Sequence, residues 1–208
     1  MRRQLLPALR MMAVLTVVLG LAYPLAVTVV AQGLFNHAAN GSLVKVNGQV
    51  VGSKLLGQTF TGNQYFQGRP SAAGITASGS LDSNGQPGNP SDLSLSNSGG
   101  SNYGPNNSTF LNLVSQRVAA YRKLNGLAAK AKVPVDAVTS SSSGVGPEIS
   151  VANARLQAAR VAKARSISQT TVNGLIDTYT DSRSAGILGD PGVNVLELNL
   201  ALDRLGHS

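Results

Sequence analysis

An uninterrupted apolar segment near the N-terminus constrains this chain more than any other feature. Residues 11–31 read MMAVLTVVLGLAYPLAVTVVA and contain no charged side chain. At about 1.5 Å of helical rise per residue, a helix of this length spans about 30 Å, the thickness of a bilayer's hydrocarbon core. Gly20 and Pro24 weaken a helix in water but are tolerated in one that crosses a membrane. The segment therefore predicts a single transmembrane helix over residues 11–31.

The charges that flank this segment predict its direction. Three cations precede it, Arg2, Arg3 and Arg10, whereas the stretch from Gln32 to Leu43 contains no Lys or Arg. Because the cytoplasmic ends of membrane helices carry the excess of Lys and Arg, we expect residues 1–10 in the cytoplasm. Residues 32–208 then form a domain on the other side of the membrane.

A cleaved signal peptide is the alternative to a retained anchor. Residues 29–31 have the small-residue form of a cleavage site. The apolar run is longer than the 7–15 residues usual in a signal peptide, which favours retention. A mature protein that begins at Gln32 would show cleavage, and both interpretations place the domain outside.

The composition predicts one domain with an aliphatic core. Of the 208 residues, 12% are charged and 4% are aromatic, and Trp is absent. Removing the membrane segment leaves a length typical of a single domain. Because the chain has no Cys, a disulfide framework, a Cys-ligated zinc site and a thiol nucleophile are excluded.

Local patterns in residues 32–208 predict an α+β fold with a small hairpin sheet and several packed helices. Over residues 43–60, apolar residues flank Asn47-Gly48, the strongest short signal for a β-hairpin. Residues 135–139 are interpreted as a short strand. Apolar spacing and candidate caps predict further helices: Phe110 to Ala131, one ending near Ser166 and capped by Ser150, and one capped by Ser168.

The C-terminal segment fits two interpretations. Leucine at every second position over residues 196–202 suits a strand, but the apolar spacing of the same segment also fits a helix. Asn194, followed three residues later by Glu197, resembles a capping box, and Pro191 lies just upstream. These start signals favour a helix.

A long polar segment, residues 71–109, is rich in Gly, Ser, Asn and Pro and lacks apolar periodicity. A structureless stretch of this length inside a domain is unusual, so we expect it to be functional or ordered by a partner. Within it, residues 95–102 read LSNSGGSN. Successive glycines and hydroxyls can present backbone N–H groups to an anion, and a solvated loop is the alternative.

No residue pattern points to catalysis or to a resident metal ion. The two histidines, His37 and His207, lie far apart in the sequence, and the acidic residues are single and scattered. This argues against a Ser-His-Asp triad, paired carboxylates and a metal cluster. Residues 52–54 are the nearest approach to a phosphate-binding Walker loop, and their spacing is wrong. We predict no catalytic residue, no metal site and no nucleotide hydrolysis by this chain alone.

The formal net charge is +8, and nine cations lie between Arg117 and Arg165, opposed only by Asp136 and Glu148. Nucleic acid is one possible partner of such a stretch. Tyr121 is its only aromatic residue, however, and a membrane anchor is unusual in a nucleic-acid-binding protein. We therefore expect no nucleic acid, and expect solvent, lipid headgroups or an acidic partner subunit to face these cations.

Short sequence blocks follow one another along nearly the whole chain. They read VGS at 51–53, LGQTF at 56–60, YF at 65–66, GRPSA at 68–72, SGGSN at 98–102, GP at 104–105, VPVD at 133–136, SSG at 142–144, PEIS at 147–150 and VNVLELN at 193–199, with Gln157, Arg160 to Ala162 and Arg165 between the last two. Each block is weak alone, but their joint order and spacing are specific. In these blocks the chain resembles the C subunit of the Kdp potassium-transporting P-type ATPase.

The resemblance implies an accessory, non-catalytic subunit of a high-affinity potassium pump in the bacterial plasma membrane. The implied partners are a channel-like potassium-binding subunit, a P-type subunit that hydrolyses ATP, a very small subunit and membrane lipid. The family's C subunit has been described as a chaperone that raises the ATP affinity of the catalytic subunit. By likeness to the ABC-transporter signature, its nucleotide contacts would be Ser98, Gly99, Gly100 and Ser101. Gln157 is added to them because it matches a glutamine of the family. ATP and potassium would then be ligands of the complex, with none bound by this chain alone.

The chain departs from the family at one block. The family usually has Gly-Leu-Asp-Pro-His-Ile-Ser where this chain has GVGPEIS over residues 144–150. The acid before the proline is replaced by Gly146, so no role of that acid carries over to this chain.

The expected topology conflicts with direct contact between this domain and ATP. ATP is cytoplasmic, whereas the cations before the membrane segment place Ser98 outside. An external domain could instead cap the potassium entrance of the channel-like subunit and hold the complex together. The alternative function is a free-standing anchored domain that binds an extracytoplasmic ligand or the cell envelope.

Overall fold

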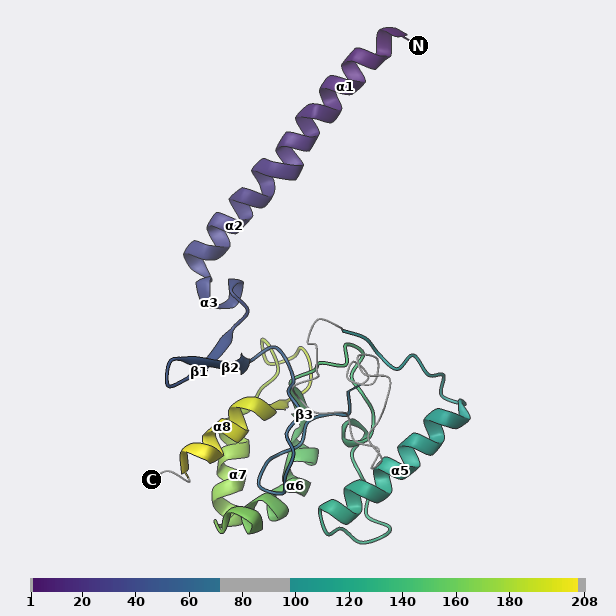
Figure 1. Cartoon of the computed structure of the whole chain (residues 1–208), viewed down its shortest axis with the longest axis vertical. Helices are drawn as coiled ribbons and strands as arrows, with labels where there is room; N and C mark the ends of the chain where they lie inside the picture. Colours follow the sequence, from purple (N-terminus) through teal and green to yellow (C-terminus); the bar gives the residue numbers. More distant parts are fainter. Residues whose placement is uncertain (1, 72–97, 206–208) are drawn as a thin grey trace. The chain divides into compact units, whose positions relative to one another are not determined.

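The computed structural model describes residues 2–71 and 98–205 and divides between Val51 and Gly52 into two units, which are described separately. The first unit is built on one continuous helix that comprises α1 (Arg2–Val17), the π-helical turn η1 (Val18–Ala22) and α2 (Tyr23–Leu34), shown in purple in Figure 1. The stretch Arg3–Leu34 is the one helix of the described residues that is long and apolar enough to cross a membrane. The predicted helix of residues 11–31 lies wholly within it.

A π-helical turn interrupts the α-helical pattern in the middle of this helix. The Tyr23 N–H donates to the carbonyl of Val18, five residues back. Pro24 follows, and in a regular α-helix its ring would collide with the carbonyl of Gly20, four residues back. The wider turn relieves this collision, and the Thr28 hydroxyl donates to the Pro24 carbonyl (2.8 Å).

The predicted hairpin is confirmed. A short helix, α3 (Asn36–Ala39), precedes β1 (Leu43–Val46) and β2 (Gln49–Ser53), which pair with each other. Asn47 and Gly48 both have positive φ angles, 51° and 81°. This is the conformation of a type I′ turn, which Asn-Gly adopts at little cost.

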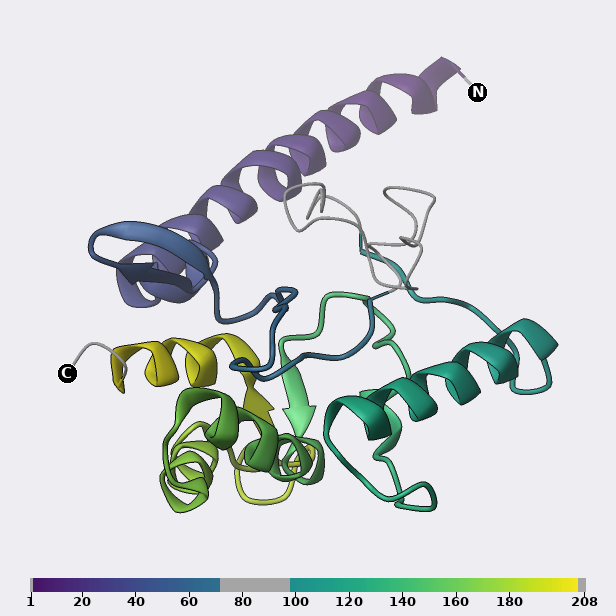
Figure 2. The same ribbon diagram turned by 60° about the horizontal axis from the view of Figure 1, so that its bottom comes forward.

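The second unit combines helices with a three-stranded antiparallel sheet in the order β3-β5-β4. Its elements are α5 (Ser108–Leu124), η3 (Val135–Ala137), β3 (Glu148–Ser150), α6 (Val151–Arg165), α7 (Gln169–Thr178), β4 (Thr180–Asp181), β5 (Gly192–Asn194) and α8 (Val195–Leu205). In Figures 1 and 2, α6, α7 and α8 lie together and α5 lies to one side of them. The predicted α+β class is confirmed, but this sheet was not predicted, because strands of two or three residues are too short to show alternation.

The predicted caps begin three of the helices. The side chains of Ser150, Ser168 and Asn194 accept hydrogen bonds from the backbone N–H three residues on. The second half of the predicted capping box was wrong. The Glu197 side chain does not accept a hydrogen bond from the Asn194 N–H, which donates to the Tyr179 carbonyl instead. The Glu197 carboxylate instead pairs with the Lys54 ammonium at 3.3 Å.

Two predicted elements between residues 110 and 139 differ from the structure. The helix expected to reach Ala131 ends at Leu124, because Asn125 follows and Gly126 adopts a positive φ of 63°. The strand expected over residues 135–139 is wrong. Val135–Ala137 instead form the 3₁₀ turn η3, at whose end the Val138 N–H donates to the Val135 carbonyl (3.1 Å).

The core of the second unit is aliphatic, as predicted, with one buried Phe. Small residues of α6 pack against α7 and the sheet, and α8 contributes residues to the same cluster. The core residues are Phe66, Ile149, Ala154, Ala158, Val161, Ala162, Val172, Ile176, Val193, Val195, Leu198 and Leu202. Most of the polar segment predicted over residues 71–109 lies outside the described residues, and so does His207.

Candidate functional site

The predicted nucleotide-contact segment lies in an irregular loop against a second Ser/Gly loop. The Gly99 N–H and the Ser98 hydroxyl both donate to the Ser143 carbonyl, at 2.8 and 3.0 Å. Gly100 passes so close to Ser142 that an added Cβ would lie 2.9 Å from the Ser142 carbonyl oxygen. Glycine at position 100 is therefore required for the packing of these two loops.

The backbone N–H groups of Gly100 and Ser101 decide whether this loop can bind an anion. The N–H groups of Gly100 and Ser101 have no hydrogen-bond partner within residues 2–71 and 98–205, and Ser101 is exposed. Adjacent N–H groups of this kind can bind an anion. The N–H of Gly99 is already used by the protein, so the surface offers fewer donors than the sequence pattern suggests.

Gln157, the fifth predicted contact, is buried on α6 with an exposed fraction of 1%. Its Oε1 accepts from the Gln67 N–H (2.8 Å) and from Arg160 Nη2 (2.7 Å). Its Nε2 donates to the Gln67 carbonyl (3.0 Å) and to Asn153 Oδ1 (2.9 Å). A glutamine amide offers two donors and two acceptor lone pairs, so every position is used. None of these bonds joins Gln157 to residues 98–101 in the described part of the chain.

Asn199 on α8 holds the neighbouring residue in the same way. Its Oδ1 accepts from the Phe66 N–H (2.8 Å), and its Nδ2 donates to the Phe66 carbonyl (2.9 Å). Side-chain amides from two helices thus bond both backbone groups of two consecutive residues, as an adjacent strand would do. Both residues, Phe66 and Gln67, belong to the segment 62–71, which we call the clamped loop.

Arg160 is buried and binds the start of the clamped loop. Its Nη1 donates to the carbonyls of Asn63 (2.7 Å) and Tyr65 (3.0 Å), and its Nε donates to Asn125 Oδ1 (2.9 Å). No carboxylate lies within ion-pair distance of it among the described residues. Burial lowers the pKa of this guanidinium, with a smaller opposing effect from Tyr121. Neutral carbonyl and amide oxygens therefore stabilise the positive charge of Arg160.

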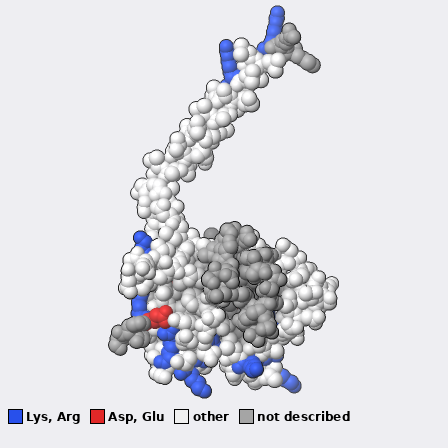
Figure 3. Space-filling view, in the orientation of Figure 1, with Lys and Arg blue, Asp and Glu red and all other residues white. Residues whose placement is uncertain are grey.

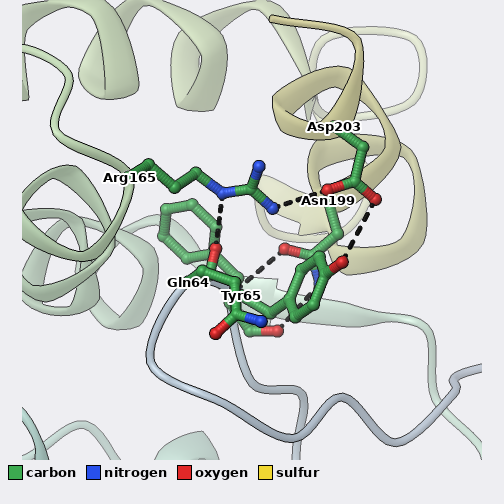
Figure 4. Close-up of polar contacts among 6 residues, drawn as sticks. Gln64, Tyr65, Arg165, Asn199 and Asp203 are labelled. Atoms are coloured by element: carbon green, nitrogen blue, oxygen red, sulfur yellow. Dashed lines mark hydrogen bonds and ion pairs between the residues drawn. The ribbon is translucent and has the colours of Figure 1, made fainter. Parts of the chain in front are cut away.

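Arg165 fixes the adjacent part of the loop from the end of α6. Its Nε donates to the Gln64 carbonyl (2.7 Å), and its Nη2 pairs with Asp203 Oδ1 (2.7 Å) (Figure 4). The guanidinium lies over the Tyr65 ring, 5.0 Å from its centre, and the Tyr65 hydroxyl donates to Asp203 (3.4 Å). This cluster joins α6, α8 and the clamped loop.

Asp136 ties the 3₁₀ turn η3 to the start of α6. Its carboxylate accepts from the Ser150 N–H (2.8 Å), the Ser150 hydroxyl (2.8 Å) and Asn153 Nδ2 (3.0 Å). Asn153 Oδ1 in turn accepts from the Tyr121 hydroxyl (2.8 Å). Burial raises the pKa of the Tyr121 phenol, and the nearby Asp136 charge adds to this rise. The network connects α5 and η3 through α6 to the clamped loop.

The other end of the clamped loop is held by the second Ser/Gly loop. Arg69 donates to the carbonyls of Thr139 (3.3 Å) and Ser140 (3.0 Å), and the Ser71 hydroxyl donates to Gly144 (2.6 Å). The same loop contacts Ser98 and Gly99, so residues 139–144 lie between the clamped loop and the predicted nucleotide-contact segment.

Gly146, where the family usually has an acid, is closely packed. Its N–H donates to the Ser141 hydroxyl (3.2 Å), and a Cβ added to it would lie 3.2 Å from the same oxygen. Its carbonyl lies directly against Gly57, where the structure leaves no room for a side chain. An acid at this position would therefore require a shift of the Ser141 side chain.

The cations between Arg117 and Arg165 do not form one solvent-facing stretch, so that expectation was wrong for part of them. Arg117 donates to Val138 (3.1 Å), Arg122 to Ala131 (2.6 Å), and Arg155 pairs with Asp177 (2.9 Å). With Arg160 and Arg165, five of the nine bind groups of their own domain. The other four are exposed lysines, Lys123, Lys130, Lys132 and Lys163, and the side chain of Arg155 is also 58% exposed. Figure 3 shows Lys and Arg gathered along the lower edge of the second unit.

Sequence reasoning missed the asparagines and the aspartate of this framework. Asn199 stands between Leu198 and Leu200, and Asn153 begins the apolar face of α6. An amide on the apolar face of a helix is a signal for a buried hydrogen bond, because burying it unpaired is costly. The signal does not name the partner. For Asn199 the partner is the Phe66 backbone, 133 residues away in sequence, whereas Asn153 bonds the side chains of Asp136, Tyr121 and Gln157.

Comparison with known proteins identifies the family. The family model described as K+-transporting ATPase, c chain, matches residues 5–204. The chain belongs to the KdpC family. A KdpC subunit of a potassium-transporting ATPase from Mycobacterium tuberculosis H37Rv is 53% identical over 205 residues, covering 99% of this chain and 100% of that protein. KdpC subunits from Paraburkholderia phytofirmans and Koribacter versatilis are 47% and 44% identical, each over at least 97% of this chain and 95% of the relative.

Proposed function

We propose that this chain is a non-catalytic subunit that assembles and stabilises a potassium-transporting ATPase from outside the cytoplasm. The membership in the KdpC family supports the pump, and the single apolar helix supports attachment to the bacterial plasma membrane. Arg3 and Arg10 precede the apolar run and support a cytoplasmic N-terminus. The implied partners are the channel-like, catalytic and small subunits.

The burial and hydrogen bonding of Gln157 are the observation on which this proposal rests. Its amide is buried, and all four of its hydrogen-bonding positions are used inside the domain. A nucleotide could reach it only after the clamp on Gln67 had opened. The geometry therefore favours a rigid docking module over a domain that contributes this residue to an ATP site.

A second candidate is the ATP-affinity role implied by the family resemblance. The observation that favours it is that the N–H groups of Gly100 and Ser101 have no partner among the residues that the structure describes, so they could bind a phosphate group. It requires Ser98 to Ser101 to face the cytoplasm, opposite to the topology proposed above. ATP and potassium remain proposed ligands of the whole complex in both cases.

Co-purification tests the assembly proposal. A tag on the catalytic subunit should retain this chain in mild detergent, and deleting the chain should abolish both an intact complex and potassium uptake. If the chain alone behaves as a stable membrane-anchored protein and is never retained with a larger subunit, the proposal is wrong. That result would favour the free-standing ligand-binding or envelope-binding domain.

A further inference from the structure

An exposed loop with an apolar tip connects β4 to β5, and nothing in the proposed function uses it. Residues 181–190 are all exposed, and they form the yellow-green loop between α7 and α8 in Figure 1. At its tip, Ile187 is 77% exposed and Leu188 is 63% exposed. Ile187 is the most exposed of the large apolar side chains that the structure describes.

The backbone of this loop is ordered by its own hydrogen bonds. Ser184 and Leu188 form an antiparallel bridge, with N–H to carbonyl distances of 2.9 Å in both directions. Between them, Ala185 and Gly186 have positive φ angles of 52° and 78°. Alanine in this left-handed region is unfavourable, so the loop holds its turn against a local preference. The apolar tip therefore lies on a turn that these two hydrogen bonds close.

The loop has the composition of a small interface with a polar rim. Single exposed aliphatic residues are common, but two adjacent ones at the end of this loop form a patch that excludes water when covered. Behind the tip, the Arg183–Asp190 ion pair (3.1 Å) crosses the base of the loop.

The charges around the tip distinguish a protein partner from a lipid surface. A polar hollow of about 450 Å³ beside the tip is lined by Glu148, Asp181, Asp190 and Arg183 among others. Arg183 is the only cation of the segment from Thr180 to Asn194, which has no aromatic residue. Loops and helices that insert at membrane surfaces carry Lys, Arg and aromatic residues. Asp181 also pairs with the Lys54 ammonium at 3.5 Å, so the three carboxylates face two cations and the rim keeps a net charge of −1. A net acidic rim is repelled by anionic headgroups and complements a basic one.

We propose that Ile187 and Leu188 anchor this domain in an apolar pocket, rimmed by Lys or Arg, on another subunit of the pump. This inference rests on the proposed function as an assembly subunit. It assigns the contact to the apolar tip and acidic rim, and leaves the exposed lysines of α5 and α6 outside it. The arrangement of an apolar centre inside a polar rim is that of protein–protein hot spots.

Photo-crosslinking in the intact complex tests the location. Because the chain has no Cys, Ile187→Cys in a complex whose other cysteines are replaced accepts a single benzophenone label. We expect an adduct between this position and a larger subunit. Leu111→Cys, on the exposed side of α5 and 54% exposed, is the matched control and should give none. Adducts only with lipid, only with a second copy of this chain, or equal at both positions would overturn the inference.

A binding measurement tests the energetic role. The double substitution Ile187→Asp with Leu188→Asp should weaken retention on the tagged complex by about tenfold or more. Leu111→Asp should leave retention unchanged, and the far-UV spectrum of each variant checks folding. If wild-type chain is retained and the double variant binds equally well, the anchor is wrong while the assembly function stands. If wild-type chain is never retained, the proposed function fails and this inference fails with it.

Discussion

At the scale of single residues, side-chain amides take the place of backbone partners. Gln157 and Asn199 each bond the N–H and the carbonyl of one residue of the clamped loop. Because buried backbone groups without partners are costly, these two amides allow an irregular segment to lie against the core. Phe66, whose backbone Asn199 holds, is thereby fixed with its side chain fully buried.

Replacing Gln157 by Leu should destabilise the domain strongly. The substitution leaves the backbone groups of Gln67 unpaired and removes one bond each from Asn153 and Arg160. We expect the free energy of unfolding to fall by about 2–4 kcal/mol, measured by urea unfolding of the full chain in detergent. Gln116→Leu, at an exposed position of α5, is the control and should change it by less than about 0.5 kcal/mol. Equal stability of the two variants would show that the clamp contributes little.

The raised pKa of Tyr121 predicts that the free energy of unfolding falls at high pH. Burial raises the pKa of its phenol above the ordinary value near 10, so the folded state keeps a proton that the unfolded state loses. Its contribution to stability is complete below pH 10 and is lost as the pH rises through the folded-state pKa. The loss approaches about 1.4 kcal/mol per pH unit.

Tyr121→Phe isolates this contribution from the titration of lysines. The free energy of unfolding, measured between pH 8 and 11, should fall less steeply above pH 10 in the variant than in the wild type. Identical slopes for the two proteins would mean that the phenol titrates normally and is not held by Asn153 and its neighbours.

At the scale of elements, α5 and α6 differ in how they are anchored. Tyr121 is the only residue of α5 that is buried, whereas α6 buries seven, including Gln157 and Arg160. Helical stability in proteins comes mainly from packing, so α5 should open at a lower free energy. Hydrogen exchange followed by mass spectrometry should show faster exchange in residues 111–120 than in 156–163. Equal protection would contradict this difference.

The elements also show what the sequence could and could not predict. Hairpin, caps and helix starts depend on neighbouring residues, so Asn47-Gly48, Ser150 and Ser168 were sufficient to predict them. The sheet β3-β5-β4 and the 3₁₀ turn at Asp136 depend on partners far along the chain. Their strands are too short to carry a pattern, and the interaction of Asp136 with Ser150 is invisible before folding. The clamps at Gln157 and Asn199 were missed for the same reason.

At the scale of the whole molecule, internal bonding changes the interpretation of the net charge. Arg117, Arg122 and Arg160 bind carbonyl oxygens of their own domain, so their charge is part of the framework. The basic surface consists mainly of exposed lysines, whose strongly hydrated ammonium groups stand on flexible stems and lack the rigid donor geometry of arginine. The number of cations can be counted in the sequence. Only the fold distinguishes the cations that are hydrogen-bonded inside the domain from those that are exposed on its surface.

The side of the membrane on which Ser101 lies distinguishes a domain outside the cytoplasm from one that lies beside ATP. Ser101→Cys gives the chain a single thiol on an exposed loop. A membrane-impermeant maleimide should label this thiol from outside in spheroplasts and leave it unlabelled in inverted vesicles until detergent is added. A cysteine at Arg3 is the control and should behave in the opposite way. Labelling of Ser101→Cys only in inverted vesicles would place the domain beside ATP and contradict assembly from outside the cytoplasm.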